Sequence, residues 1–280
     1  MTLSVAIITK DEEENLPRTL ESVKELVCSL GGEIVIVDSS SMDRTVEIAR
    51  QYGAKVFSEP WKGFAGQKNS AMDKATGDWI LSLDADEPLE KECAEEITVK
   101  LKLPASGYEW CRTMDSGPGA LRKVPGGMVL GYWIPRKNFF LQRWMRHGGF
   151  YPDRKLRLIR RGAGKWIEHG AHPTIQVNGP TANLRHAMLH YAYPTLGGYL
   201  SHMNSYSTMQ AEHLNKGRRR GFDLLNIVLN PLATFFYNYV LRLGFLDGRE
   251  GLLLHLYHSG YVSWKYAKAW ELGRKQVDSP

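Results

Sequence analysis

Residues Trp79–Glu87, with the sequence Trp-Ile-Leu-Ser-Leu-Asp-Ala-Asp-Glu, give the strongest indication of the fold. The first five residues form a short apolar run that is typical of a buried β-strand, and Asp84 and Asp86 follow where that strand should end. Two carboxylates at this spacing can hold a divalent cation between them, and hard oxygen ligands suit Mg²⁺ or Mn²⁺. Acidic turns after strands are common, so the meaning of this one depends on its surroundings.

The first hundred residues alternate short apolar runs with amphipathic segments. We expect strands at 4–9, 33–37, 54–57 and 79–83, and helices at 15–27, 45–52 and 66–76. This alternation predicts an α/β fold in which parallel strands are joined by helical crossovers. Ligands then bind at the carboxyl ends of the strands, where Thr9, Asp38 and Asp84 fall.

The pattern changes after residue 103 to short strands and Gly/Pro turns. Lys155–Arg161 alternates well enough to predict a strand. From residue 195 the chain becomes helical, with expected helices at about 196–216, 221–243 and 249–273. We therefore expect one domain at 1–194 and a basic, apolar helical region at 195–280.

The net charge of +6 is unevenly distributed. Residues 1–100 have 11 Lys/Arg against 20 Asp/Glu, whereas residues 101–280 have 25 against 10. Residues 136–165 hold ten Lys/Arg, mostly arginine among aromatic residues, and Asp153 is the only acid there. Such a stretch suits phosphate recognition or an anionic membrane surface. The acidic first third argues against nucleic acid as a partner.

The segment Phe222–Phe245 is strongly apolar and approaches the roughly 20 residues that span a bilayer. Polar residues interrupt it, so a buried or interface-lying helix is favoured over a span. The preceding Arg218-Arg219-Arg220 favours docking on an acidic leaflet. Three cysteines without metal-ligand spacing indicate a reducing compartment, and the N-terminus lacks the features of a signal peptide.

Several nucleotide-binding folds are excluded by their motifs. There is no Gly-x-Gly-x-x-Gly after the first strand, no Gly-x-x-x-x-Gly-Lys-Ser/Thr, and no nucleophile elbow. A Rossmann oxidoreductase, a P-loop NTPase and a Ser- or Cys-dependent hydrolase are therefore disfavoured.

The remaining motifs resemble the family 2 glycosyltransferases of the GT-A fold, and more closely the bacterial lipopolysaccharide core β-glucosyltransferase group. The superfamily resemblance is carried by Val5–Glu12, Ile34–Thr45 and Leu83–Glu87. The subgroup resemblance is carried by Gln67–Asn69, Arg146–Leu158 and Gly244–Gly248. The resemblance extends over almost the whole chain, and it implies a mixed, mainly parallel sheet flanked by helices, with a helical C-terminal extension.

The resemblance implies a nucleotide-sugar-binding half at 1–103 and an acceptor half at 104–194. The donor, a UDP-sugar, would contact Thr9, Asp11, Glu12, Asp38, Lys68, Asp84, Ala85 and Asp86. Asp84 and Asp86 would hold Mg²⁺ or Mn²⁺, with Asp86 as the more direct ligand.

An inverting transfer also needs a general base for the acceptor hydroxyl. Asp153, within the subgroup motif, is the first candidate, and an ion pair with Arg154 or Arg157 is its structural alternative. Glu168 is the second candidate and His172 the third. Relatives often have an acidic residue directly after the histidine, where this chain has Pro173.

The acceptor or its phosphate would contact Arg146, His147, Arg157 and Arg161. On a strand, Arg157 and Arg161 share a face. His190 and Tyr191 are expected in the acceptor pocket or in its packing. Trp144, Phe150 and Tyr151 are expected either as sugar-stacking platforms or as core.

The predicted function is transfer of a hexose from a nucleotide sugar to a lipopolysaccharide-core or lipid-linked glycan. The expected location is cytoplasmic, peripheral at the cytoplasmic face of the inner membrane. A sugar nucleotidyltransferase is less consistent, because acidic residues follow the first strand. A non-catalytic nucleotide-sugar- or glycolipid-binding protein is the alternative that Pro173 supports.

Overall fold

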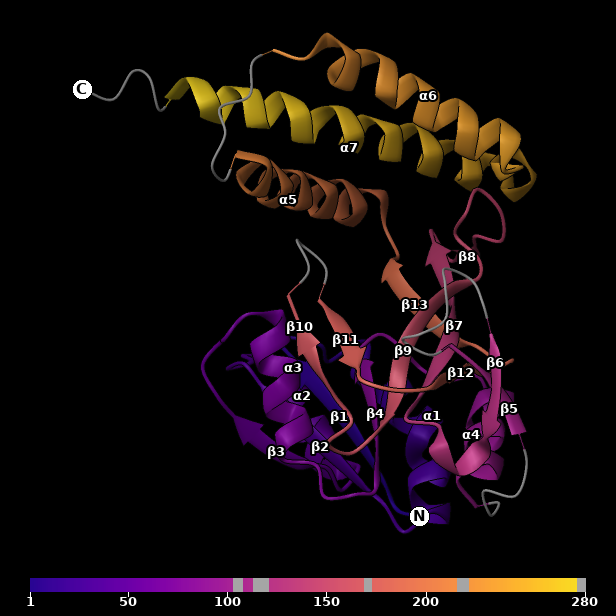
Figure 1. The fold of residues 1–280 in the computed structure, drawn as a ribbon. Helices are drawn as coiled ribbons and strands as arrows, with labels where there is room; N and C mark the ends of the chain where they lie inside the picture. Colours follow the sequence, from indigo (N-terminus) through magenta and orange to yellow (C-terminus); the bar gives the residue numbers. More distant parts are fainter. Residues whose placement is uncertain (103–107, 113–120, 169–172, 216–221, 276–280) are drawn as a thin grey trace. The chain divides into compact units, whose positions relative to one another are not determined.

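The computed structural model describes residues 1–102, 108–112, 121–168, 173–215 and 222–275. The first hundred residues form the expected alternation of strands and helices (Figure 1). The strands are β1 (Leu3–Thr9), β2 (Glu33–Asp38), β3 (Lys55–Ser58) and β4 (Trp79–Asp84). The helices are α1 (Leu16–Ser29), α2 (Thr45–Gln51), α3 (Phe64–Asp73) and α4 (Lys91–Lys102), of which α4 was not predicted.

The later part of the chain supplies the remaining strands. They are β5 (Tyr108–Cys111), β6 (Arg122–Pro125), β7 (Gly131–Phe140), β8 (Arg143–Trp144), β9 (Asp153–Arg160), β10 (Gly164–Ile167), β11 (Thr174–Val177), β12 (Thr181–Asn183) and β13 (Met188–Tyr193). The strand predicted at Lys155–Arg161 is β9.

The main sheet has the strand order β12-β7-β9-β4-β1-β2-β3, with β8 and β13 also paired to β7. Strands β4, β1, β2 and β3 are parallel, and Thr9 lies opposite Asp38 at the shared carboxyl edge. Strand β9 runs antiparallel to β4, with Leu158 opposite Leu81 and Arg160 opposite Trp79. The sheet is mixed and mainly parallel in its first half, as predicted.

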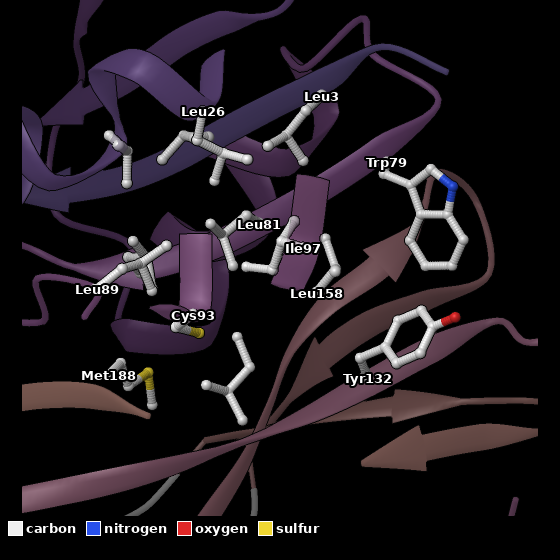
Figure 2. Close-up of a cluster of buried hydrophobic side chains, with 14 of the residues drawn as sticks. Leu3, Leu26, Trp79, Leu81, Leu89, Cys93, Ile97, Tyr132, Leu158 and Met188 are labelled. Carbon is white, nitrogen blue, oxygen red and sulfur yellow. The ribbon is translucent and has the colours of Figure 1, made fainter. Parts of the chain in front are cut away.

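Alternate residues of the central strands enter two different cores. Leu81 and Leu83 of β4 join a cluster with α1 and α4, where Leu26, Cys93 and Ile97 lie buried (Figure 2). Ile80 joins a second cluster with Trp166 and residues of α3. Because both faces of the sheet are covered, these strands are apolar throughout rather than alternating with polar residues.

The chain folds into two compact units. Of the described residues, the first unit comprises those within 1–136, 154–168 and 173–190, and the second comprises those within 137–153 and 191–275. The first unit contains the parallel strands and both cores described above.

The second unit is built largely on helices α5 (Leu196–Asn215) and α7 (Gly248–Lys275), which pack against each other. The helix predicted at 221–243 is helical from Leu225 to Leu241, but α6 (Asn230–Phe236) lies between π-helical turns at Leu225–Leu229 and Tyr237–Leu241. Segments α5, α7 and α6 lie side by side (Figure 1). Within the described residues, no helix combines the length and the apolar character needed to cross a bilayer.

Candidate active site

Buried polar side chains close the carboxyl ends of β1 and β2. The Thr9 hydroxyl donates to Asp38 Oδ1 over 2.9 Å, and the Ser41 backbone N–H donates to Asp38 Oδ2 over 2.9 Å. The Ser41 hydroxyl also donates to Asp38. Asp38 is 1% exposed, so it holds the turn after β2 in place and has little surface for a ligand.

The loop after β1 is tied to the loop after β2. Asp11 has a positive φ of 51°, and its Oδ1 accepts from the Met42 N–H over 2.7 Å. The Glu12 backbone N–H donates to Thr45 Oγ1 over 2.8 Å. Burial, followed by the nearby carboxylates of Asp84, Asp43 and Asp11, raises the pKa of Glu12 although Asn15 donates to it.

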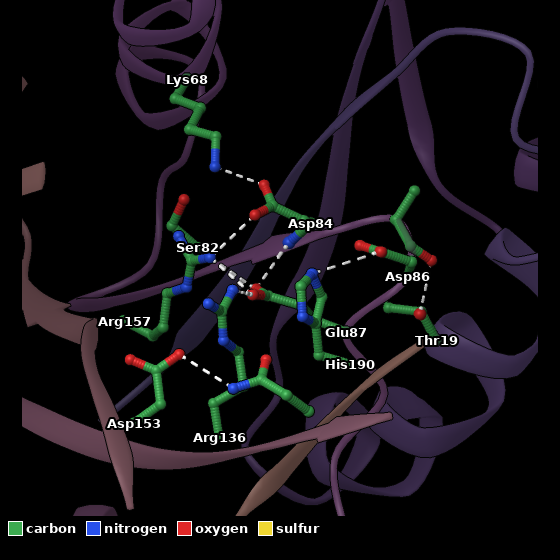
Figure 3. A network of polar contacts seen from close by, with 12 residues as sticks. Thr19, Lys68, Ser82, Asp84, Asp86, Glu87, Arg136, Asp153, Arg157 and His190 are labelled. Carbon is green, nitrogen blue, oxygen red and sulfur yellow. Dashed lines mark hydrogen bonds and ion pairs between the residues drawn. The ribbon is translucent and has the colours of Figure 1, made fainter. Parts of the chain in front are cut away.

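Asp84, the last residue of β4, lies between two buried cations (Figure 3). Lys68 Nζ contacts Asp84 Oδ1, and Arg157 Nη2 lies 2.8 Å from Oδ2. Burial favours the neutral acid, but Lys68 and Arg157 outweigh it and lower the pKa of Asp84. Burial also lowers the pKa of Lys68, against the opposing effect of Asp84. Asp84 is therefore a charge-balanced carboxylate.

Glu87 is the centre of a second set of bonds that sequence analysis did not assign. It is fully buried, and Arg157 Nη2 and Arg136 Nη1 lie 2.7 and 2.9 Å from its carboxylate. Its Oε2 accepts from the Asp84 backbone N–H over 3.1 Å. Burial raises the pKa of Glu87, but the arginines outweigh this effect and lower it. The only sequence signal was its place directly after Asp86, and Arg136 had none.

Asp86 has less positive charge around it than Asp84 has. Burial first, and then the carboxylates of Glu87, Asp84 and Glu12, raise the pKa of Asp86 to about 7. His190 Nε2 lies 3.5 Å from Asp86 Oδ2, but burial lowers the pKa of this imidazole to about 3, so it adds little positive charge. A divalent cation would neutralise this excess of carboxylate.

The donor set agrees with Mg²⁺ or Mn²⁺. Within the described ranges, no group of three or more His, Cys, Asp and Glu side chains forms a metal cluster. Mg²⁺ is commonly bound by only one or two carboxylates together with substrate phosphates and water. Asp86, and Asp84 beside it, fit that mode of binding.

The Gln-Lys-Asn segment fixes α3 over this site. The Lys62 backbone N–H donates to Gln67 Oε1 over 3.2 Å, which holds the turn that precedes the helix. Asn69 exchanges two hydrogen bonds with the Trp166 backbone, of 2.9 and 2.8 Å. Lys68 Nζ then lies 4.3 Å from the centre of the Trp166 ring as well as against Asp84. Each member of the segment therefore has a separate structural role.

Thr19 and Ala85 fix the main chain of the acidic turn. The Thr19 hydroxyl in α1 donates to the Ala85 carbonyl over 2.6 Å. Ala85 is 4% exposed, so a larger side chain would disturb the turn that presents Asp84 and Asp86.

Arg157 and Arg161, predicted to act together, lie at opposite ends of β4. Arg157 is 4% exposed and reaches Asp84, whereas Arg161 Nε donates to the Gly77 carbonyl over 2.9 Å, before β4 begins. Because β9 runs antiparallel to β4, four residues of β9 carry the chain about 13 Å toward the amino end of β4. The structure therefore brings Arg157 to Asp84 and does not bring Arg161 there.

The candidate bases fall in different places. Glu168 is exposed, and its Oε1 lies over the turn at Gly63, 3.4 Å from where a Cβ on that glycine would be. Asp153 belongs to the second unit, where its Oδ2 accepts from Asn138 Nδ2 over 3.2 Å. His172 lies outside the described residues.

Arg146 and His147 also belong to the second unit. The Arg146 guanidinium lies 4.7 Å from the ring centre of Trp144. His147 donates its backbone N–H to Asp247 Oδ2 over 2.9 Å, and its Nδ1 lies 2.8 Å from Asp247 Oδ1. This contact joins two of the subgroup motifs, Arg146–Leu158 and Gly244–Gly248.

Two glycines that follow His147 allow the same loop to pack closely on the residues around Asp247. Gly148 and Gly149 have φ of 67° and 86°, and a Cβ on either would come within 2.2 Å of His255 or Arg242. Phe150 packs on His255 with ring centres 5.6 Å apart, which favours core over sugar platform for this residue. The part of Arg146–Leu158 that lies in this unit therefore meets a packing requirement here.

The chain is similar to known glycosyltransferases. Residues 4–165 match the family described as Glycosyl transferase family 2. The lipopolysaccharide core biosynthesis glycosyltransferase LpsC of Rhizobium meliloti is 30% identical over 256 residues, which are 89% of this chain and 82% of LpsC. An uncharacterized glycosyltransferase of Rickettsia felis is 48% identical over 95 residues, and this match spans about a third of that protein (32%).

The fold has a counterpart among solved structures. The mannosyltransferase PcManGT of Pyrobaculum calidifontis, in complex with GDP-Man and Mn²⁺, aligns with 96% of this chain and 87% of its own, with a TM-score of 0.51 and 16% identity. That likeness concerns the fold alone. Together with the family match and the extent of the LpsC match, it identifies this chain as a member of glycosyltransferase family 2, with a GT-A-like α/β fold.

Proposed function

We propose that this enzyme is an inverting, metal-dependent hexosyltransferase that uses a UDP-sugar. The observation that carries the proposal is the excess of half-buried carboxylate at Asp86, beside Asp84 with its two cations Lys68 and Arg157, at the carboxyl edge of parallel strands. Ligands of open α/β sheets bind at this edge.

The chain's own residues supply most of the electrostatics in this proposal. Lys68 and Arg157 hold Asp84 ionised and place two positive charges where a diphosphate would leave. Asp86, with Asp84, would hold Mg²⁺ or Mn²⁺, which offsets charge on the leaving diphosphate. Thr9, Asp11, Glu12 and Asp38 would shape the nucleoside pocket, with Asp38 acting through the turn that it fixes.

The acceptor is proposed to be a lipopolysaccharide-core or lipid-linked glycan at the cytoplasmic face of the inner membrane. The likeness to LpsC supports this class of acceptor. Arg146 and His147 are proposed to contact it, and Asp153, Glu168 or His172 to take the proton from its hydroxyl. A single displacement at the anomeric carbon inverts its configuration without a covalent intermediate.

Slow hydrolysis of the donor tests this proposal without knowledge of the acceptor. The full chain is incubated with Mn²⁺ and a panel of UDP-, GDP- and dTDP-hexoses, and ¹H NMR follows the anomeric proton of the first sugar released. We expect one α-linked UDP-hexose to give the β-sugar before mutarotation. The α-sugar as first product would contradict inversion, and binding without turnover of any donor, even with glycolipid present, would support the non-catalytic alternative.

A further inference from the structure

The second unit exposes an unusual number of large apolar side chains. Of the twenty-six that are exposed among the described residues, fifteen lie between Phe222 and Leu256. On the segment 224–241 these include Leu225, Leu229, Leu232 and Phe236, which are 61%, 55%, 63% and 55% exposed. Contiguous exposed apolar surface of this kind marks a site of interaction.

The asparagines of the same segment are less exposed than its leucines and are hydrogen-bonded within the chain. Asn226 and Asn230 are half-buried, with Asn230 Nδ2 donating to Asn226 Oδ1 over 2.6 Å and the Asn226 amide contacting Asp223. Ser263 of α7 donates to the Ile227 carbonyl over 2.7 Å. An amphipathic helix in water has the opposite arrangement, with its apolar side packed and its polar side outward. The outward side of this segment is therefore suited to an apolar environment.

The charges of residues 195–280 favour a lipid bilayer with anionic headgroups as the partner of this apolar face. From Leu224 to Leu246 the sequence has no acidic residue and one basic residue, Arg242. Residues 195–280 as a whole have ten Lys/Arg against six Asp/Glu. The excess of four equals the cluster of Lys216 and Arg218–Arg220, which precedes the apolar segment directly in the sequence. Anionic lipid headgroups attract such a cluster, and a hydrophobic segment next to basic residues is typical of helices that lie in a bilayer interface.

We infer that the outward face of residues 224–246 docks on an anionic phospholipid bilayer. The exposed leucines and Phe236 enter the boundary between headgroups and acyl chains, while Asn226 and Asn230 stay on the side of α7. The inference deepens the proposed function and rests on it in one respect only, since docking here would bring the enzyme to a lipid-linked acceptor.

Vesicle flotation with the full chain tests the surface. We expect the protein to float with phosphatidylglycerol vesicles and much less with phosphatidylcholine vesicles, and the triple variant Leu225→Ser/Leu229→Ser/Leu232→Ser to lose at least about tenfold in partitioning. The matched control, Val99→Ser/Leu121→Ser/Met128→Ser, removes three exposed apolar residues of the first unit and should float like the wild type. Equal flotation of the two variants would overturn the inference.

A fluorescent label makes the test independent of the triple variant. Leu232→Cys in a Cys28→Ser background is coupled to an environment-sensitive dye, with Met128→Cys in the same background as control. We expect vesicles to increase the emission at position 232 and not at 128. A protein dimer in buffer alone, seen by light scattering, that covers position 232 would mean that a second copy of the chain occupies this face. The membrane inference would then fail. UDP-sugar binding by the triple variant separates the two proposals, because loss of docking should leave donor binding unchanged.

Discussion

The two units depart from the usual division of buried apolar and exposed polar residues in opposite ways. The first unit buries charge, with Glu87 fully buried and Lys68 and Arg157 about 5% exposed. The second unit exposes apolar side chains along residues 224–246 and buries an imidazole, His255, without a hydrogen-bond partner within the described residues. Buried charges require partners inside the chain, whereas exposed apolar surface requires a partner outside it.

The largest expected effect concerns the carboxylate that the first unit leaves in excess. Asp86→Asn should lower turnover of the nucleotide sugar at least about 100-fold, because it removes a charge that would hold the cation at the diphosphate. The measurement is the steady-state rate of donor hydrolysis with Mn²⁺. Asp73→Asn, at an exposed position of α3, is the control and should keep wild-type activity. If Asp86→Asn keeps its activity, the metal site must lie at other residues.

The next effect tests whether the buried charges of the first unit depend on one another. Arg157→Leu should reduce the free energy of unfolding by about 3–5 kcal/mol, since it leaves the fully buried Glu87 with too little positive charge and removes one of the two cations of the half-buried Asp84. Denaturant unfolding measures it. Arg160→Leu, at an exposed position of the same strand, should cost well under about 1 kcal/mol. Equal losses for the two variants would mean that the network does not stabilise the unit.

The next prediction concerns the close packing of Gly148 on His255 in the second unit. Gly148→Ala should destabilise this unit by about 4 kcal/mol, because the new Cβ would lie 2.1 Å from the His255 ring and φ is +67°. Gly162→Ala also has a positive φ, +79°, but nothing lies within 4 Å, so only about 1 kcal/mol of backbone strain is expected. Thermal unfolding of both variants checks the difference, and equal shifts would show that packing on His255 is not the cause.

The smallest effect is a pH dependence that arises from His255. Burial, followed by the neighbouring His258, lowers its pKa from the ordinary 6.5 to about 4, with Asp247 opposing. Since the folded pKa lies below the unfolded one, the unfolded chain takes up the proton first. Stability is thus complete above pH 6.5 and falls by up to about 3 kcal/mol toward pH 4. Urea unfolding at several pH values should show a shallower decline for His255→Phe than for the exposed control His213→Phe. Identical slopes would contradict the assignment.

The sequence was informative where local pattern and position coincide. Strand-helix alternation predicted β1 to β4 within a residue or two, and the parallel sheet then placed Thr9 opposite Asp38 and Asp84 nearby. The pairing of strands that are far apart in the sequence could not be predicted from it. The antiparallel register of β9 on β4 decides that Arg157, and not Arg161, reaches Asp84. Arg136 reaches Glu87 from β7 without any local signal.

The helical region illustrates a different limit. Apolar content correctly indicated a helix in 221–243, but content alone does not tell which side faces outward. That information came from Asn226 and Asn230, whose half-buried positions turn the leucines toward the surroundings. The packing of Gly148 on His255 likewise joins segments about a hundred residues apart, which no local pattern reports.

The most direct test of a metal-dependent donor site at Asp86 is equilibrium binding of UDP-hexoses by titration calorimetry, with and without Mn²⁺, for the wild type and Asp86→Asn. If Asp86 holds the cation, one UDP-hexose should bind the wild type, Mn²⁺ should tighten this binding at least about tenfold, and Asp86→Asn should abolish the effect of the metal. Binding that is equally tight without Mn²⁺ and in the variant would contradict the assignment of Asp86 as the residue that holds the cation.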